Sequence, residues 1–198
     1  MKKQLATLAA ALAIAGSASA GVGPNAIRVD LKQPSKTIQF ESTEAAPVRF
    51  EAVVFKWTAE GLEPTKEVIA YPPVFTVAPE SKQAIKILAR KPRGEAEGTY
   101  RLVFKAIEGA GVNISVPVFL PPAAPGKAVV SAKRGNGVIT LTNTGNVTER
   151  ITKTHQGGKQ IPADVLLYVL PGQTVRIEDT ERRIEKMTGD QLAVEVQS

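Results

Sequence analysis

Hydrophobic and polar residues alternate along most of the chain, in short runs that turn residues separate. A period of two is typical of β-strands, whose successive side chains point to opposite faces of a sheet. The runs recur about every ten residues, a spacing typical of antiparallel sandwiches. The pattern predicts strands at 26–31, 36–41, 48–58, 66–69, 74–77, 83–89, 100–107, 112–120, 128–132, 138–142, 147–154, 165–170, 174–178 and 192–196. No long stretch carries a helical stripe, so the predicted fold class is all-β.

The run at 111–120, GVNISVPVFL, combines two features that conflict. Val112, Ile114 and Val116 alternate with polar residues, but Pro117 stands inside the run. Proline is confined to edge strands, strand ends and bulges. An apolar strand at an exposed edge is an aggregation hazard. The run is therefore predicted to be an edge strand, and an exposed apolar edge strand calls for a functional explanation.

A proline-rich segment divides the chain. Residues 121–126, PPAAPG, contain three prolines and one glycine, and the alternation stops there. We therefore expect a first domain at 21–121, a linker at 122–126 and a second domain at 127–198. The second domain is small for a seven-stranded sandwich, so it is expected to be trimmed or to lean on the first. Turn residues at 143–146 and 157–159 predict two hairpins inside it.

The N-terminus has the pattern of a secretory signal peptide. Lys2 and Lys3 precede a small apolar core at 5–14, and 17–20 reads SASA. This predicts export and cleavage after Ala20. The apolar core is too short to span a membrane, and no later segment approaches that length. Removing the two lysines changes the formal net charge from +6 to +4.

The composition excludes several kinds of chemistry. The chain has no cysteine and one histidine, which leaves no disulfide framework, no Cys-based zinc site and no thiol nucleophile. It contains no nucleophile-elbow, zincin, Walker or Rossmann motif. Acidic and basic residues at 178–183 are interpreted as a charged loop. We therefore expect neither catalysis nor a cofactor, and an exported protein is not expected to bind nucleic acid.

Five motifs occur in an order that resembles a known family. They are VFKWT at 54–58, LEPT at 62–65, YPPVFTVAPESKQAIKI at 71–87, TYRLVFKAI at 99–107, and ISVPVF at 114–119 before the prolines. This order resembles the periplasmic pilus-assembly chaperones of chaperone–usher systems, in a form similar to the archaic or spore-coat branch. The resemblance implies two immunoglobulin-like sandwiches in tandem. It covers residues 26–122 well and the second domain loosely.

The resemblance also implies a use for the edge strand. In this family the last strand of the first domain completes a pilus or coat-fibre subunit that lacks a strand. Backbone hydrogen bonds and alternating side chains then hold the client. The residues expected to fill client pockets are Val112, Ile114 and Val116. Alternation alone leaves open that these residues face the core of their own domain.

A second implied feature is a cationic site for the client's terminal carboxylate. Arg28 matches the family's first-strand arginine by position. The family's second cation, a lysine, falls at Pro117, so this chain departs from the pattern. We expect Arg101 to replace it, with Lys105 on the same strand face as a supporting cation. For each arginine, the alternative is a solvated charge on the strand surface.

The implied partners are pilin or fimbrial subunits and an outer-membrane usher, and the free protein has an edge that permits self-pairing. A structural fibre subunit or surface adhesin of immunoglobulin-like fold is the alternative function. An exported hydrolase is a third, which the absence of a catalytic constellation disfavours. Trp57 is interpreted as packing near a strand end. Tyr71-Pro72-Pro73 predicts a rigid turn, with the isomer of its proline bonds left open.

Overall fold

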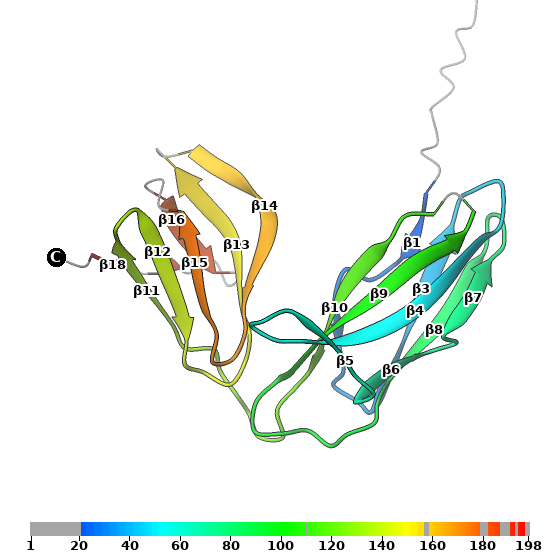
Figure 1. The fold of residues 1–198 in the computed structure, drawn as a ribbon, viewed down its shortest axis with the longest axis horizontal. Coiled ribbons are helices and arrows are strands. Elements are labelled where there is room, and N and C mark those ends of the chain that lie inside the picture. Colours follow the sequence, from blue (N-terminus) through cyan, green and yellow to red (C-terminus); the bar gives the residue numbers. More distant parts are fainter. Residues whose placement is uncertain are drawn as a thin grey trace, which may run out of the picture.

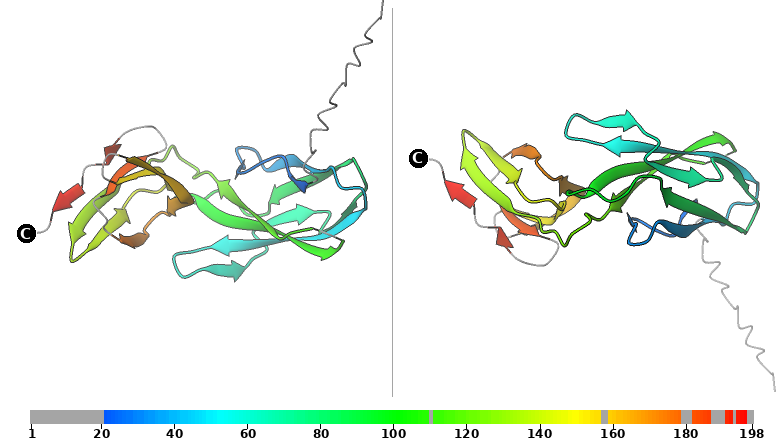
Figure 2. Two further views of the ribbon diagram at one scale, coloured as in Figure 1. Left: turned by 90° about the horizontal axis from the view of Figure 1, so that it is seen from above. Right: turned by 90° about the horizontal axis from the view of Figure 1, so that it is seen from below.

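The computed structural model describes residues 21–109, 111–156, 159–178, 182–186, 191–192 and 194–196. The predicted signal peptide at 1–20 lies outside the described residues. Every regular element of these ranges is a β-strand, so the all-β prediction is confirmed. Two lobes lie side by side and meet at an angle, as Figure 1 shows, and Figure 2 shows the same pair from above and below. Each lobe is a sandwich of two sheets.

Two sheets form the first domain. One has the order β1-β3-β8-β6, with strands Val22–Pro24, Ser35–Ser42, Lys82–Ala89 and Val68–Tyr71. The other has the order β2-β10-β9-β4-β5, with strands Val29–Asp30, Ile114–Leu120, Gly98–Glu108, Val48–Trp57 and Leu62–Pro64; β7, Val74–Val77, also pairs with β4. The strand predicted at 26–31 is therefore wrong in its first half. There the chain leaves one sheet after β1 and enters the other at β2.

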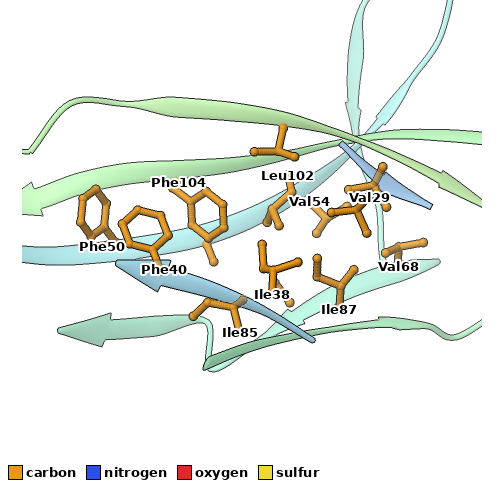
Figure 3. Packing of buried hydrophobic residues seen from close by; sticks show 14 of the residues in the cluster. Val29, Ile38, Phe40, Phe50, Val54, Val68, Ile85, Ile87, Leu102 and Phe104 are labelled. Atoms are coloured by element: carbon orange, nitrogen blue, oxygen red, sulfur yellow. The ribbon is translucent and has the colours of Figure 1, made fainter. Parts of the chain in front are cut away.

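Alternating side chains from both sheets fill the core of the first domain. Phe40 lies at its centre, with ring centroids 4.7 Å from Phe50, 4.8 Å from Phe104 and 5.3 Å from Phe75. Figure 3 shows the rings of Phe40, Phe50 and Phe104 beside the aliphatic side chains of Ile38, Ile85 and Ile87. Burying such a side chain contributes about 1.5–3 kcal/mol. The apolar positions of the two-residue alternation thus form the inward faces of the long strands of the first domain.

The second domain has a smaller core. One sheet has the order β15-β12-β11-β18, with strands Thr174–Glu178, Val138–Asn143, Val130–Gly135 and Val194–Val196. The other has the order β14-β13-β16-β17, with strands Lys159–Val169, Glu149–Gln156, Arg182–Lys186 and Gln191–Leu192. The described buried residues between them are Ala132, Ile139, Leu141, Ile151 and Val169.

Two sequence interpretations of the second domain are wrong. The turn at 143–146 does not close a hairpin, because β12 and β13 belong to different sheets. The interpretation of 178–183 as a loop is wrong at both ends, because Glu178 ends β15 and Arg182–Lys186 is a strand that pairs with β13; residues 179–181 lie outside the described residues. The other predicted hairpin is confirmed, since β13 and β14 pair with Gln156 opposite Lys159.

Hydrogen bonds fix the two domains against each other. The Glu97 carboxylate accepts the Thr148 N–H at 2.9 Å, and the Glu97 N–H donates to the Asn146 carbonyl at 2.8 Å. The Asn146 amide donates to the Glu95 carbonyl at 2.9 Å. Within the second domain, Gly145 passes so close to the segment that follows the linker that a Cβ there would clash with the Lys127 carbonyl oxygen. The junction is therefore a set of specific contacts.

Candidate functional site

Strand β10 has one paired edge and one edge that is mostly open. It pairs with β9 over its whole length, from Ile114 opposite Phe104 to Leu120 opposite Gly98. On its other side β2 pairs only with Val118 and Phe119, in parallel. Within the described part of the chain, no strand covers the outer edge of β10 before these two residues. The predicted edge strand is thus open at its N-terminal half.

The direction of the backbone groups follows from one hydrogen bond. The Leu31 N–H donates to the Phe119 carbonyl at 2.8 Å, so the backbone groups of Phe119 point away from β9. Because direction alternates along a strand, those of Ser115 and Pro117 point the same way. Pro117 has no N–H, so its missing donor falls on the outer edge and leaves the ladder to β9 intact. The ladder between β10 and β2 therefore does not extend back to Pro117, because Pro117 has no N–H to donate to β2.

The three residues predicted to fill client pockets lie in three different surroundings. Val116 is 2% exposed and belongs to the core of its own domain. Ile114 is half-buried and packs against that core, with its Cδ1 3.4 Å from the position of a Cβ on Gly23. Val112 is 67% exposed and precedes β10. Their burial therefore falls steadily toward the start of the strand.

Asn113 ends the pairing of β10 with β9. Its side-chain Oδ1 accepts the Ala106 N–H at 3.0 Å, where a residue of β10 would otherwise provide a carbonyl. The β9 backbone therefore stays satisfied although β10 begins only at Ile114. The sequence analysis missed this residue.

Arg28 lies next to β10 and already has an anionic partner. Its guanidinium carbon is 4.4 Å from the centroid of the Phe119 ring. Its Nη2 is 2.7 Å and its Nε 2.8 Å from Oδ1 of Asp30. A client carboxylate at Arg28 would therefore share this cation with Asp30.

Arg101 has a different environment. It stands on β9 opposite Pro117, with its guanidinium carbon 3.9 Å from the Trp57 ring centroid and 5.6 Å from that of Tyr168. Burial lowers the pKa of Arg101, and none of the ion pairs among the described residues involves it. A guanidinium stacked on a ring still presents its N–H donors along its edges. Arg101 is thus a partly desolvated cation with donors available for an anion.

The structure does not bring Lys105 to the site around Arg101. Its Nζ lies 3.8 Å from Oε2 of Glu51 and 6.0 Å from the Phe55 ring centroid. It lies four residues beyond Arg101 on β9, which is about 13 Å along a strand. Its side chain therefore has a local acidic partner, away from the Arg101 stack.

No described group of three or more His, Cys, Asp or Glu residues is arranged to hold a metal ion. The described ranges also contain no helix long and apolar enough to cross a membrane.

A family model described as "Pili and flagellar-assembly chaperone, PapD N-terminal domain" matches residues 21–118. The chain belongs to this chaperone family. The match runs from β1 to Val118, so it includes the open edge of β10 and both arginines. The resemblance to pilus-assembly chaperones is therefore confirmed, and the protein is a pilus-assembly chaperone.

Solved structures of other chaperones share the fold. A chain of the CsuC–CsuE chaperone–tip adhesion subunit complex from archaic Csu pili of Acinetobacter baumannii matches with a TM-score of 0.69 at 16% identity, covering 91% of this chain and 100% of that one. A chain of the Salmonella enterica SafA pilin–SafB chaperone complex matches at 0.68 and 15%, covering 87% and 93%. The E. coli chaperone DraB matches at 0.66 and 14%, covering 88% and 94%. No curated protein matches the chain.

The second domain of the chaperone adds two residues to the aromatic cluster beside Arg101 that the sequence analysis missed. Tyr168 packs with Phe119, Leu170 and Trp57 at the domain junction. The guanidinium carbon of Arg150 lies 5.6 Å from the Tyr168 ring centroid. Trp57 packs as predicted, although its partners lie in both domains. Arg150 and Tyr168 lie about fifty residues or more from Arg101 in sequence, so no local motif indicates their proximity.

Proposed function

We propose that this chaperone binds pilus, fimbrial or coat-fibre subunits by adding its strand β10 to their incomplete sheets. The observation that carries the proposal is the open outer edge of β10 between Ile114 and Pro117. An edge of this kind binds an extended partner through backbone hydrogen bonds, while alternate side chains enter pockets of the partner. The complex would then deliver its client to an outer-membrane usher.

The graded burial of Val112, Ile114 and Val116 divides their proposed roles. Val112 and Ile114 carry the exposed apolar surface that a client groove can cover, whereas Val116 holds the strand to its own domain. Burial of two such side chains in a client contributes about 3–5 kcal/mol before ordering costs. The open edge also allows free copies to pair with each other.

Arg101 is the proposed centre of the carboxylate site, because it is a partly desolvated cation without an anionic partner among the described residues. Arg28 contributes from the position just before β2, with its charge shared with Asp30. Lys105 is proposed to act only as a supporting cation, since Glu51 lies beside it. A bidentate contact from a guanidinium suits a chain-terminal carboxylate.

The remaining proposals concern processing and domain limits. We infer export to the periplasm, with a signal peptide at 1–20 cleaved after Ala20, from the sequence pattern there. The domains are proposed to be 21–121 and 127–198, since β10 ends at Leu120 and β11 begins at Val130. The function requires no catalysis and no cofactor. Membership of the archaic branch stays a prediction.

Co-expression with the pilin of a neighbouring gene tests strand addition. Ile114→Asp places a charge on the apolar face of the open edge and should abolish recovery of the complex by affinity purification. Leu62→Asp, on β5 at the far edge of the same sheet, is the matched control and should leave recovery unchanged. Equal recovery with Ile114→Asp and with the wild type would show that the client does not use this strand.

A further inference from the structure

Two buried polar atoms at the domain junction lack partners. Tyr168 is 5% exposed, and its hydroxyl has no hydrogen-bond partner. The Nε of Arg150 is also buried without a partner. Leaving such a group unsatisfied is costly, because it has lost its water without gaining another bond. Both atoms come from the second domain. One is the hydroxyl of Tyr168 itself, and the other belongs to Arg150, whose guanidinium lies beside the Tyr168 ring.

The position of these side chains follows from strand register. Arg150 on β13 stands directly opposite Tyr168 on β14, so the two side chains share one face of the sheet. That face is turned toward the first domain, since Tyr168 packs against Trp57 and Phe119 with ring centroids 5.2 and 5.7 Å apart. The register of the second domain therefore brings Arg150 and Tyr168 together at the domain junction, where Arg101 contacts the same ring.

Two cations meet at one aromatic ring. The guanidinium carbons of Arg101 and Arg150 each lie 5.6 Å from the Tyr168 ring centroid. Two partly desolvated guanidinium groups that contact the same ring create a local positive charge, which favours an anion near them. The nearby Asp30 carboxylate is bonded to Arg28, and Oε1 of Glu149 accepts the backbone N–H of Arg150 at 3.1 Å. The place is suited to an anion that comes from outside the chain.

We propose that Arg150 and the Tyr168 hydroxyl form the second-domain half of the client-carboxylate site, opposite Arg101. This inference rests on the proposed binding of a client strand. The ligand is a terminal carboxylate, because the guanidinium groups and the hydroxyl supply hydrogen-bond donors and a carboxylate accepts hydrogen bonds without donating any. A carboxylate bound there contacts both domains at once, so it acts as a bridge across the junction.

The test uses the full mature chain and a labelled synthetic peptide of alternating valine and serine with N-terminal lysines. The peptide is made with a free C-terminal carboxylate and with a C-terminal amide, and binding is followed by fluorescence anisotropy. The wild type should prefer the free acid by roughly tenfold or more, the value of a charged hydrogen bond. Arg150→Gln and Tyr168→Phe should each reduce that preference severalfold, without changing the affinity for the amide.

Arg176→Gln is the matched control, because Arg176 is an exposed arginine on the other sheet of the same domain. The Arg176→Gln variant should keep the full preference for the free-acid peptide over the amide. Tyr168→Phe retains the ring and its packing, so it decides the question even if Arg150→Gln folds poorly by circular dichroism.

The two levels of the proposal fail in different ways. An undiminished acid preference in both Arg150→Gln and Tyr168→Phe would overturn the second-domain half and leave strand addition intact. An Ile114→Asp chain that binds both peptides as tightly as the wild type would instead count against strand addition itself.

Discussion

Val116 and Ile114 lie two residues apart on one face of β10, and truncating each should affect different properties. Val116→Ala removes two carbons from a side chain that is 2% exposed. The lost transfer free energy is about 1.6 kcal/mol, and the cavity raises the cost to about 2–3 kcal/mol of unfolding free energy. Each kcal/mol lowers the midpoint by about 4–8 °C for a domain of this size. We therefore expect the first domain of this variant to melt roughly 10–20 °C lower.

Ile114→Ala removes three carbons, but the side chain is only half-buried in the free protein. Its cost to the unfolding free energy should be about 1 kcal/mol. If a client groove covers the exposed half and Ile114 reaches a pocket there, the affinity for a pilin should fall by roughly 10-fold or more. Val116→Ala should change that affinity by less than about threefold, because its side chain already faces its own core.

Calorimetry of the free chain and competition binding with a labelled pilin measure the two quantities separately. The expected pattern is a crossed one: Val116→Ala mainly lowers stability, and Ile114→Ala mainly lowers affinity. If Ile114→Ala destabilised the free chain as much as Val116→Ala and left client affinity unchanged, Ile114 would be only a core residue. The division of roles along β10 would then be wrong.

Two further predictions concern the domain junction and the second domain. Burial raises the pKa of Glu97, so this carboxyl binds a proton more readily in the folded state than in the unfolded state. Protonation of Glu97 therefore stabilises the fold at low pH, and this stabilisation is lost as the pH rises through the raised pKa. Glu97→Gln should remove that pH dependence, seen by comparing melting temperatures of both proteins from about pH 7 to about pH 4; parallel curves would contradict it. Asn143 is fully buried, its Oδ1 accepting the N–H groups of Val129 and Gly145 and its Nδ2 donating to the carbonyls of Val147 and Val169. Asn143→Ala should cost about 3 kcal/mol or more in urea unfolding, because buried backbone groups lose their partners, and a loss below about 1 kcal/mol would refute this.

The long strands of the first domain could be predicted from the sequence because one face of each is buried, and burial imposes the period of two. The missed strand Arg182–Lys186 lacks that pattern, since charged residues occupy most of its positions. The hairpin predicted at 143–146 failed because turn residues indicate a reversal of the chain but not the sheet that the next strand joins. A better hairpin signal was present at Asn136-Gly137. These two residues form the turn between the paired strands β11 and β12, with φ angles of 52° and 74°.

The site was predictable only where it lies within one strand or follows from the family resemblance. The open run on β10 is continuous in sequence, so its alternation and its proline were visible. Arg101 was found through its strand, whereas its stacking on Trp57 depends on the pairing of β9 with β4. The contributions of Arg150 and Tyr168 depend on how the two domains pack. That packing arises from contacts such as the one between Thr148 and Glu97, which no local pattern encodes.

The position of Pro117 limits how much of this chain is open to uncontrolled association. Cross-β assemblies need about six or seven consecutive residues that can pair on an edge. Here β2 covers β10 from Val118 onward, Pro117 offers no N–H, and β10 begins only at Ile114. Ser115 alone presents an outward N–H within that interval of the strand. A partner without a complementary groove gains too little from so short a stretch, so the same proline that leaves the edge unpaired also keeps it from starting a fibril of the chaperone itself.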